Sequence, residues 1–203
     1  MSVSMTIDGR LVGGDGTFPV DDPAVGTPFA EAPDCTDEQL EAAVRAAQSA
    51  FAQWRLDDGT RRAALLVAAQ RIENSIDELA PLFVQEQGKP LKEAAGEVAS
   101  AIQWLRYYAD LDLSDEVLQK DDYSRVDLIR EPIGVVAAIT PWNSPIGLAF
   151  WKLAPALRAG NTIVLKPSPY TPITTLRVGE LLADILPRAS STSFRAEILS
   201  APS

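Results

Sequence analysis

The sequence predicts an α/β protein, because amphipathic helices precede one strand–helix–strand unit. The apolar run Ile133–Ile139 has the profile of a parallel strand buried on both faces, and Thr162–Leu165 is a second, β-branched apolar run. The residues between them carry apolar side chains at helical spacing, with Pro145 suited to a first turn and Gly160-Asn161 to a helix end. Because a helical crossover of this kind joins parallel strands, we expect a βαβ unit.

Composition excludes several classes of function. The chain of 203 residues has a formal net charge of −10, which argues against nucleic acid or an anionic membrane surface as a partner. It holds one cysteine and no histidine, so we expect no disulfide, no His-based metal site and no Ser-His-Asp triad. No apolar run is long enough for a membrane helix and no signal peptide is recognisable, so we expect a cytoplasmic protein. For want of histidine ligands we expect no metal.

Residues 1–33 predict a β-hairpin segment, since short apolar pieces alternate with Asp-Gly turns. Cys35 follows, between two aspartates that raise the pKa of a thiol rather than lower it, so we do not expect it to be a catalytic nucleophile.

Residues 34–120 predict four helices. Thr36 and Gln39 form a capping box for the first, Thr60 begins the second, and Gly88 ends the third. The fourth extends from Leu91 to about Asp110. Its three aromatic residues could stack on bases, but their helical spacing and the lack of nearby positive charge favour core packing; they are Trp104, Tyr107 and Tyr108.

The remaining segments divide at clear changes of pattern. Residues 121–132 predict a strand with a weak alternation. The βαβ unit and one more helix, beginning at Thr171-Pro172 as N-cap and first residue, occupy residues 133–187. Residues 188–203 show neither helical nor strand periodicity and are rich in serine, which predicts a disordered tail.

Polar residues follow both predicted strands of the βαβ unit. Ligands of open α/β sheets bind outside the carboxyl ends of the strands, where Trp142-Asn143 and Lys166-Pro167-Ser168 fall. The Asn143 carboxamide could stabilise an oxyanion or cap the helix that begins at Pro145. The Lys166 ammonium could bind ribose hydroxyls or a phosphate, or be a solvated charge at a strand end. The residues alone leave both pairs of alternatives open.

Three segments carry a resemblance to a known family: ITPWN at 139–143, WKLAPALRAGNTIVLKPS at 151–168 and YTP at 170–172. In this order and separation they resemble the aldehyde dehydrogenase superfamily, as does Glu86 followed by Gly88-Lys89-Pro90. The resemblance implies an incomplete Rossmann-like dinucleotide-binding domain with N-terminal strands and helices. It also implies a small aldehyde substrate, NAD or NADP as cofactor, and an oligomerisation strand at 121–132, since intact relatives are homo-oligomers.

The resemblance also assigns roles to residues at the two strand ends. Asn143 would help form the oxyanion hole for the tetrahedral intermediate. Lys166 would hydrogen-bond the adenosine ribose. Many NAD-preferring members carry a Glu where this chain has Pro169, which leaves the choice between NAD and NADP open. The full set expected to line the cofactor site is Ile139, Thr140, Pro141, Trp142, Asn143, Lys166, Pro167, Ser168 and Pro169.

The family's nucleophilic Cys and general-base Glu have no match in this sequence, so we expect the chain to be inactive alone. Because family members continue differently after Pro187, we hypothesise a reading-frame shift there. The alternative is a non-catalytic fragment that associates with a full-length relative. A related acyl-phosphate reductase is disfavoured by the joint presence of the two strand-end motifs.

Overall fold

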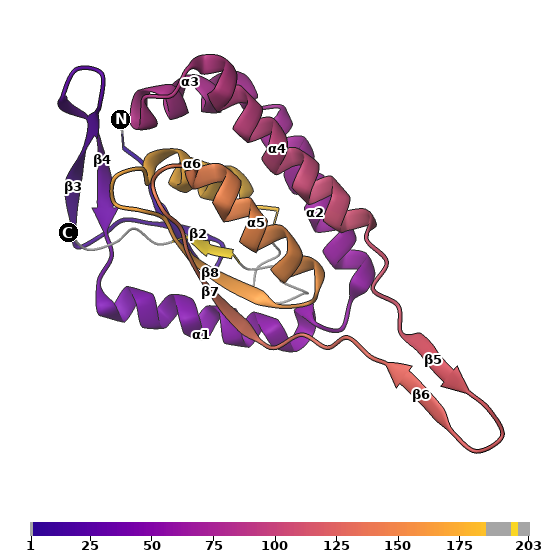
Figure 1. Cartoon of the computed structure of the whole chain (residues 1–203). Helices are drawn as coiled ribbons and strands as arrows, with labels where there is room; N and C mark the ends of the chain where they lie inside the picture. The colour runs from indigo at the N-terminus through magenta and orange to yellow at the C-terminus, as the bar shows by residue number, and fades with distance from the viewer. Residues whose placement is uncertain (1, 186–195, 199–203) are drawn as a thin grey trace.

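A five-stranded mixed sheet lies at the centre of the molecule (Figure 1). The computed structural model describes residues 2–185 and 196–198. Within them the strand order is β2-β1-β9-β8-β7, with β7 and β8 parallel and β1 antiparallel to both its neighbours. The strands are β1 Met5–Ile7, β2 Arg10–Val12, β7 Val135–Ile139, β8 Thr162–Lys166 and β9 Ala196–Ile198.

Helices cover both faces of this sheet. α1 lies on one face, while α5 and α6 lie on the other beneath α2, α3 and α4 (Figure 1). The apolar sides of these helices and the buried strand β8 form one continuous core. The helices are α1 Asp37–Trp54, α2 Asp58–Glu73, α3 Ile76–Gln87, α4 Leu91–Asp110, α5 Pro145–Arg158 and α6 Ile173–Leu182.

Most sequence signals for these helices are confirmed. Thr36 and Gln39 form the reciprocal capping box of α1, and α3 ends at Gly88, whose φ of +82° suits glycine. α5 connects the parallel strands β7 and β8, as predicted for the βαβ unit. The N-cap of α6 is Pro172 rather than Thr171, whose hydroxyl donates instead to the Trp142 carbonyl at 3.5 Å.

The N-terminal hairpins are also confirmed. β1 and β2 turn at Asp8-Gly9, where both residues have positive φ. A separate hairpin joins β3, Gly16–Asp22, to β4, Thr27–Asp34. It lies beside the end of α3 (Figure 1).

The prediction that residues 133–139 form a strand buried on both faces is wrong. β7 begins at Val135, after Gly134 with φ of +122°, and Ala137 and Ile139 are exposed. β7 is the edge strand of the described sheet, so it has β8 on one side and no neighbour on the other. An apolar run predicts a strand, but it does not show which faces of that strand are covered by other elements.

Two further expectations need correction. Residues 116–120, assigned above to the helical part, form strand β5, Glu116–Lys120, which pairs with β6, Arg125–Leu128, in an exposed hairpin. Every residue of the two strands is exposed, so no burial alternation marks β5 in the sequence. The aromatic residues of α4 are not all core: Tyr107 is 58% exposed, although Trp104 packs on Trp151 of α5 at 5.9 Å between ring centroids.

The predicted disorder of residues 188–203 is wrong for residues 196–198, which form β9 between β1 and β8. The rest of that segment lies outside the described residues. Within the described residues, no helix is both long and apolar enough to cross a membrane.

Candidate functional site

The ends of β7 and β8 lie level with each other. In the parallel register Ile139 is opposite Lys166, and the amide of Thr140 donates to the Lys166 carbonyl at 3.1 Å. The polar residues that follow the two strands therefore lie at the same end of the sheet, beyond the carboxyl ends of the strands, as the sequence predicts. The roles assigned to these residues remain predictions.

Asn143 is an exposed residue in the turn between β7 and α5. The residue at the N-cap of α5 is Ser144, so the alternative in which Asn143 caps this helix is wrong. Within the described residues, the Asn143 carboxamide makes no hydrogen bond, while its backbone carbonyl accepts one from Gln87 Nε2 at 3.5 Å. Its two N–H donors are therefore available to a ligand.

Lys166 is half-buried at the end of β8, which disagrees with a freely solvated charge. Its Nζ donates to the carbonyl of Pro167 at 3.0 Å, and burial lowers the pKa of its ammonium. Pro167 and Ser168 are buried behind it, and the Ser168 hydroxyl accepts from the amide of Tyr170 at 3.3 Å. The loop after β8 therefore holds Lys166 in a defined environment.

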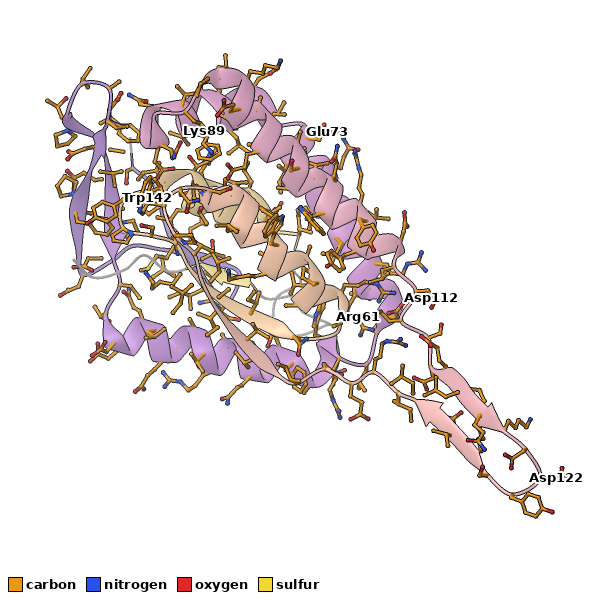
Figure 2. All side chains as sticks on the ribbon, viewed as in Figure 1. Arg61, Glu73, Lys89, Asp112, Asp122 and Trp142 are labelled. Atoms are coloured by element: carbon orange, nitrogen blue, oxygen red, sulfur yellow. The ribbon has the colours of Figure 1, made fainter. Side chains whose placement is uncertain are left out.

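A cleft of about 860 Å³ adjoins the two strand ends. Trp142 from the first end and Pro169 from the second line it, together with β3 and the end of α3. Figure 2 labels Trp142 on the side of the molecule near the β3–β4 hairpin. A second cleft of about 550 Å³ is lined by Arg61, Arg158 and the residues that lead into β5, away from the strand ends. The first cleft is the better candidate, because its lining includes residues from both strand ends.

Glu86 is a buried carboxylate at the wall of the first cleft. It accepts the backbone N–H groups of Ile173 and Thr174, the latter at 3.0 Å, at the start of α6, where no side chain of that helix caps them. Burial raises the pKa of Glu86 to about 7, outweighing the hydrogen bonds from Thr174 and Ile173 that lower it. The sequence marked Glu86 by resemblance, but not this contact.

We predict that Glu86 makes stability fall as pH rises. Its pKa is about 7 when folded and 4.5 as a reference, so the folded state binds more protons between these values. The unfolding free energy should therefore lose about 2 to 3 kcal/mol from pH 5 to pH 8 through this group. Urea titrations of wild type and Glu86→Gln should show this loss in wild type and not in the variant. Equal pH dependence in the two proteins would contradict the assignment.

Cys35 lies between β4 and α1, where its Sγ contacts the Thr36 carbonyl at 3.4 Å. Burial raises the pKa of the thiol, and the charges of Asp34 and Asp37 raise it further. The expected direction is confirmed, and this thiol has the wrong electrostatics for a nucleophile.

Sequence reasoning missed a carboxylate at the first turn of α5, just after Asn143. Glu97 of α4 accepts the backbone N–H of Gly147 at 2.8 Å and pairs with Lys89. Glu97 and Gly147 are 50 positions apart, and only the packing of α4 on α5 brings them together. No local pattern in the sequence indicates this contact.

Two level parallel strands joined by the helix α5 define an α/β protein, and polar residues follow both strands. The sequence pattern of the aldehyde dehydrogenase family matches residues 12–190. The chain belongs to the aldehyde dehydrogenase family.

Two curated relatives show the extent of the match. The fluoroacetaldehyde dehydrogenase of Streptantibioticus cattleyicolor is 39% identical over 187 residues, covering 87% of this chain and 37% of the relative. The 3-sulfolactaldehyde dehydrogenase of Pseudomonas putida is 42% identical over 177 residues, covering 84% of this chain and 36% of the relative. The chain thus spans little more than a third of the length of these relatives.

Solved structures agree on the fold. The NAD+ complex of an aldehyde dehydrogenase from Bacillus cereus superposes with a TM-score of 0.89 and 29% sequence identity, covering 99% of this chain and 42% of that structure. The described fold is therefore that of the corresponding part of an aldehyde dehydrogenase.

Proposed function

We propose that the ends of β7 and β8 form the oxyanion-stabilising corner and part of the cofactor rim of an NAD(P)-dependent site that oxidises an aldehyde to a carboxylic acid. The observation that carries this proposal is the level register of Ile139 and Lys166, which delivers Asn143 and Lys166 to one edge of the sheet. An amide N–H that points toward a developing alkoxide lowers the barrier, because it stabilises charge absent from the ground state.

The residues present fit a dinucleotide. Thr140 Oγ1 is buried and has no hydrogen-bond partner in the described residues, and the same is true of Gln87 Oε1 at the wall of the cleft. Lys166 would bind ribose hydroxyls, with Ile139, Pro141, Trp142, Pro167 and Ser168 around it. The cofactor, when bound, supplies the hydride acceptor. Pro169 offers no carboxylate to the ribose, so NADP fits the rim as well as NAD.

The reaction also needs a thiolate and a base that activates water. Cys35 is the one thiol in the sequence, and its raised pKa makes it unsuitable as the nucleophile. We propose that this chain supplies the oxyanion donor and part of the cofactor rim, and that by itself it does not turn over an aldehyde.

Cofactor binding can be tested by titrating the isotope-labelled chain with NAD+ or NADP+ and following backbone amide resonances. We expect shifts at Thr140 and Lys166. Lys166→Met should weaken binding about tenfold or more, because it removes a charged donor. Lys120→Met, at an exposed position on β5, is the matched control and should leave the affinity unchanged. Unmoved Thr140 and Lys166 amides at saturating cofactor would contradict the proposal.

Turnover is tested separately by following reduced cofactor with several aldehydes. We expect none from the chain alone. Turnover that disappears in Cys35→Ser would overturn the assignment of roles.

One observation favours a second candidate, a non-catalytic chain that docks on a full-length relative. β7 has a free edge in the described sheet, and Ile139 is exposed beside it. Size-exclusion chromatography with and without an intact relative distinguishes the two: a mixed complex supports docking, and separate elution contradicts it.

A further inference from the structure

We infer that the ion pair between Lys89 and Glu97 is a positioning device for the Asn143 turn. It holds the first turn of α5 from outside that helix and thereby fixes the backbone from which the Asn143 carboxamide extends. This inference rests on the proposed function, because the direction of that carboxamide matters only if Asn143 is the oxyanion donor. Neither residue would touch substrate, so both would act through Asn143.

The first turn of α5 lacks a cap of its own. Helices leave their first backbone N–H groups without partners, and a side chain at the N-cap usually accepts one of them. Ser144 occupies that position and makes no such bond. Instead, Glu97 Oε1 from α4 accepts the N–H of Gly147, the third residue of α5, at 2.8 Å. A carboxylate here also matches the positive end of the helix dipole.

Glycine at position 147 leaves room for the close approach of Glu97. A Cβ at that position would lie 2.8 Å from Ser144 Oγ and 3.4 Å from Glu97 Cγ. The first distance is a clash that the Ser144 side chain must relieve by moving, and the second is a close contact with Glu97. The absence of a side chain at Gly147 therefore leaves its backbone N–H accessible to the Glu97 carboxylate.

Lys89 supplies the opposite charge. Its Nζ binds Glu97 Oε2 and lies 4.6 Å from the centroid of the buried Phe83 ring. The side chains of Lys89 and Glu97 are 13% and 11% exposed, so solvent screens the pair little. Lys89 follows Gly88, the left-handed C-cap of α3, and Figure 2 labels it near the end of α3. The pair therefore connects the end of α3 with α4 and, through Glu97, with α5.

The same segment contacts the Asn143 turn from a second position. Gln87 Nε2 donates to the Asn143 carbonyl at 3.5 Å, a long bond that adds direction more than strength. Gln87 and Glu97 thus contact the backbone at Asn143 and at Gly147, on both sides of the start of α5, and Lys89 acts through Glu97. The carboxamide of Asn143 has no hydrogen bond in the described residues, so its position depends on this backbone and on its own side-chain torsions.

The test uses the full chain labelled with 15N and two resonances: the Gly147 amide and the side-chain amide of Asn143. Glu97→Leu should make hydrogen exchange at Gly147 about tenfold faster or more and move the Asn143 side-chain resonances. Lys89→Met should do the same, because it leaves a nearly buried carboxylate without its cation. Glu93→Gln, at an exposed position on the same helix, is the control and should change neither resonance.

A charge-free rescue separates positioning from general stability. Lys89→Met combined with Glu97→Gln keeps an oxygen acceptor for Gly147 and removes both charges, so slow exchange and the wild-type Asn143 resonances should return. A lower melting temperature in Glu97→Leu with unmoved Asn143 resonances would show a merely structural role and overturn the inference. Failure of the double variant to restore them would also overturn it.

These readouts are independent of cofactor. If wild type shows the Gly147 and Asn143 signatures but no cofactor-induced shift at Thr140 or Lys166, the proposed function fails while the contact between Glu97 and α5 stands. If cofactor-induced shifts are present but the Asn143 side-chain resonances are the same in Glu97→Leu and wild type, only the positioning role fails.

Discussion

Trp54→Ala should lower the free energy of unfolding by about 4 kcal/mol, near the upper end for loss of a large buried side chain. Trp54 is the last residue of α1 and is 0% exposed. Its indole Nε1 donates to the carbonyl of Leu157 at 3.2 Å, in the last turn of α5. The substitution therefore removes a packed ring and leaves a buried carbonyl without this donor. Urea denaturation followed by circular dichroism gives the difference.

Trp151→Ala is the matched control for residue type. Trp151 lies on the same helix as Leu157 but is 57% exposed, so its loss should cost about 1 kcal/mol or less. Trp54→Phe keeps a buried aromatic ring but removes the donor and part of the ring volume, so it should cost less than Trp54→Ala, about 1 to 2 kcal/mol. Similar losses for Trp54→Ala and Trp151→Ala would contradict the placement of Trp54 at the centre of the core.

Local patterns in the sequence predicted the helices well, because their ends depend on nearby residues. The capping box of Thr36 with Gln39 and the glycine at position 88 are contained within a single turn of chain. The strand ends were predictable for a related reason: parallel strands joined by a crossover finish at one edge whatever surrounds them.

The errors arose where a residue's environment depends on distant parts of the chain. Ile139 is apolar whether or not another strand covers it, so its exposure depends on the order of strands in the sheet. Asn143 and Ser144 are both good N-cap residues, and the spacing to Pro145 does not distinguish them. Glu97 finds Gly147 only after α4 and α5 have packed.

Buried arginines illustrate the same limit. Arginine side chains usually lie at the surface, yet those of Arg61 and Arg158 are only 8% and 3% exposed. Arg61 donates to the carbonyls of Trp54 and Arg158, and Arg158 donates to that of Leu111. These guanidinium groups satisfy carbonyls at the ends of three helices, a need that appears only when those ends meet.

Asp58→Ala should therefore destabilise the protein by about 2 to 3 kcal/mol. The Asp58 carboxylate pairs with Arg61 at 2.8 Å and also with Arg158, so its removal leaves two buried cations without their shared counter-charge. Breaking a fully buried pair costs about 3 to 5 kcal/mol, and the value here is lower because the Asp58 side chain is 51% exposed. Asp110→Ala is the control: it loses a single 3.8 Å pair with the exposed Arg62 and should cost about 0.5 kcal/mol or less.

The effect of Asp58→Ala should also depend on pH. Burial raises the pKa of Asp58, but the hydrogen bond from Arg158 and the charges of Arg158 and Arg61 outweigh burial and hold the pKa below its usual value of 3.8. A pKa depressed in the folded state means that the carboxylate contributes stability above the unfolded pKa and loses it as pH falls through the folded value. Urea titrations should show the full difference from wild type at neutral pH and a smaller one below about pH 4. A difference that grows as the solution is acidified would show that Asp58 is not the counter-ion of the two arginines.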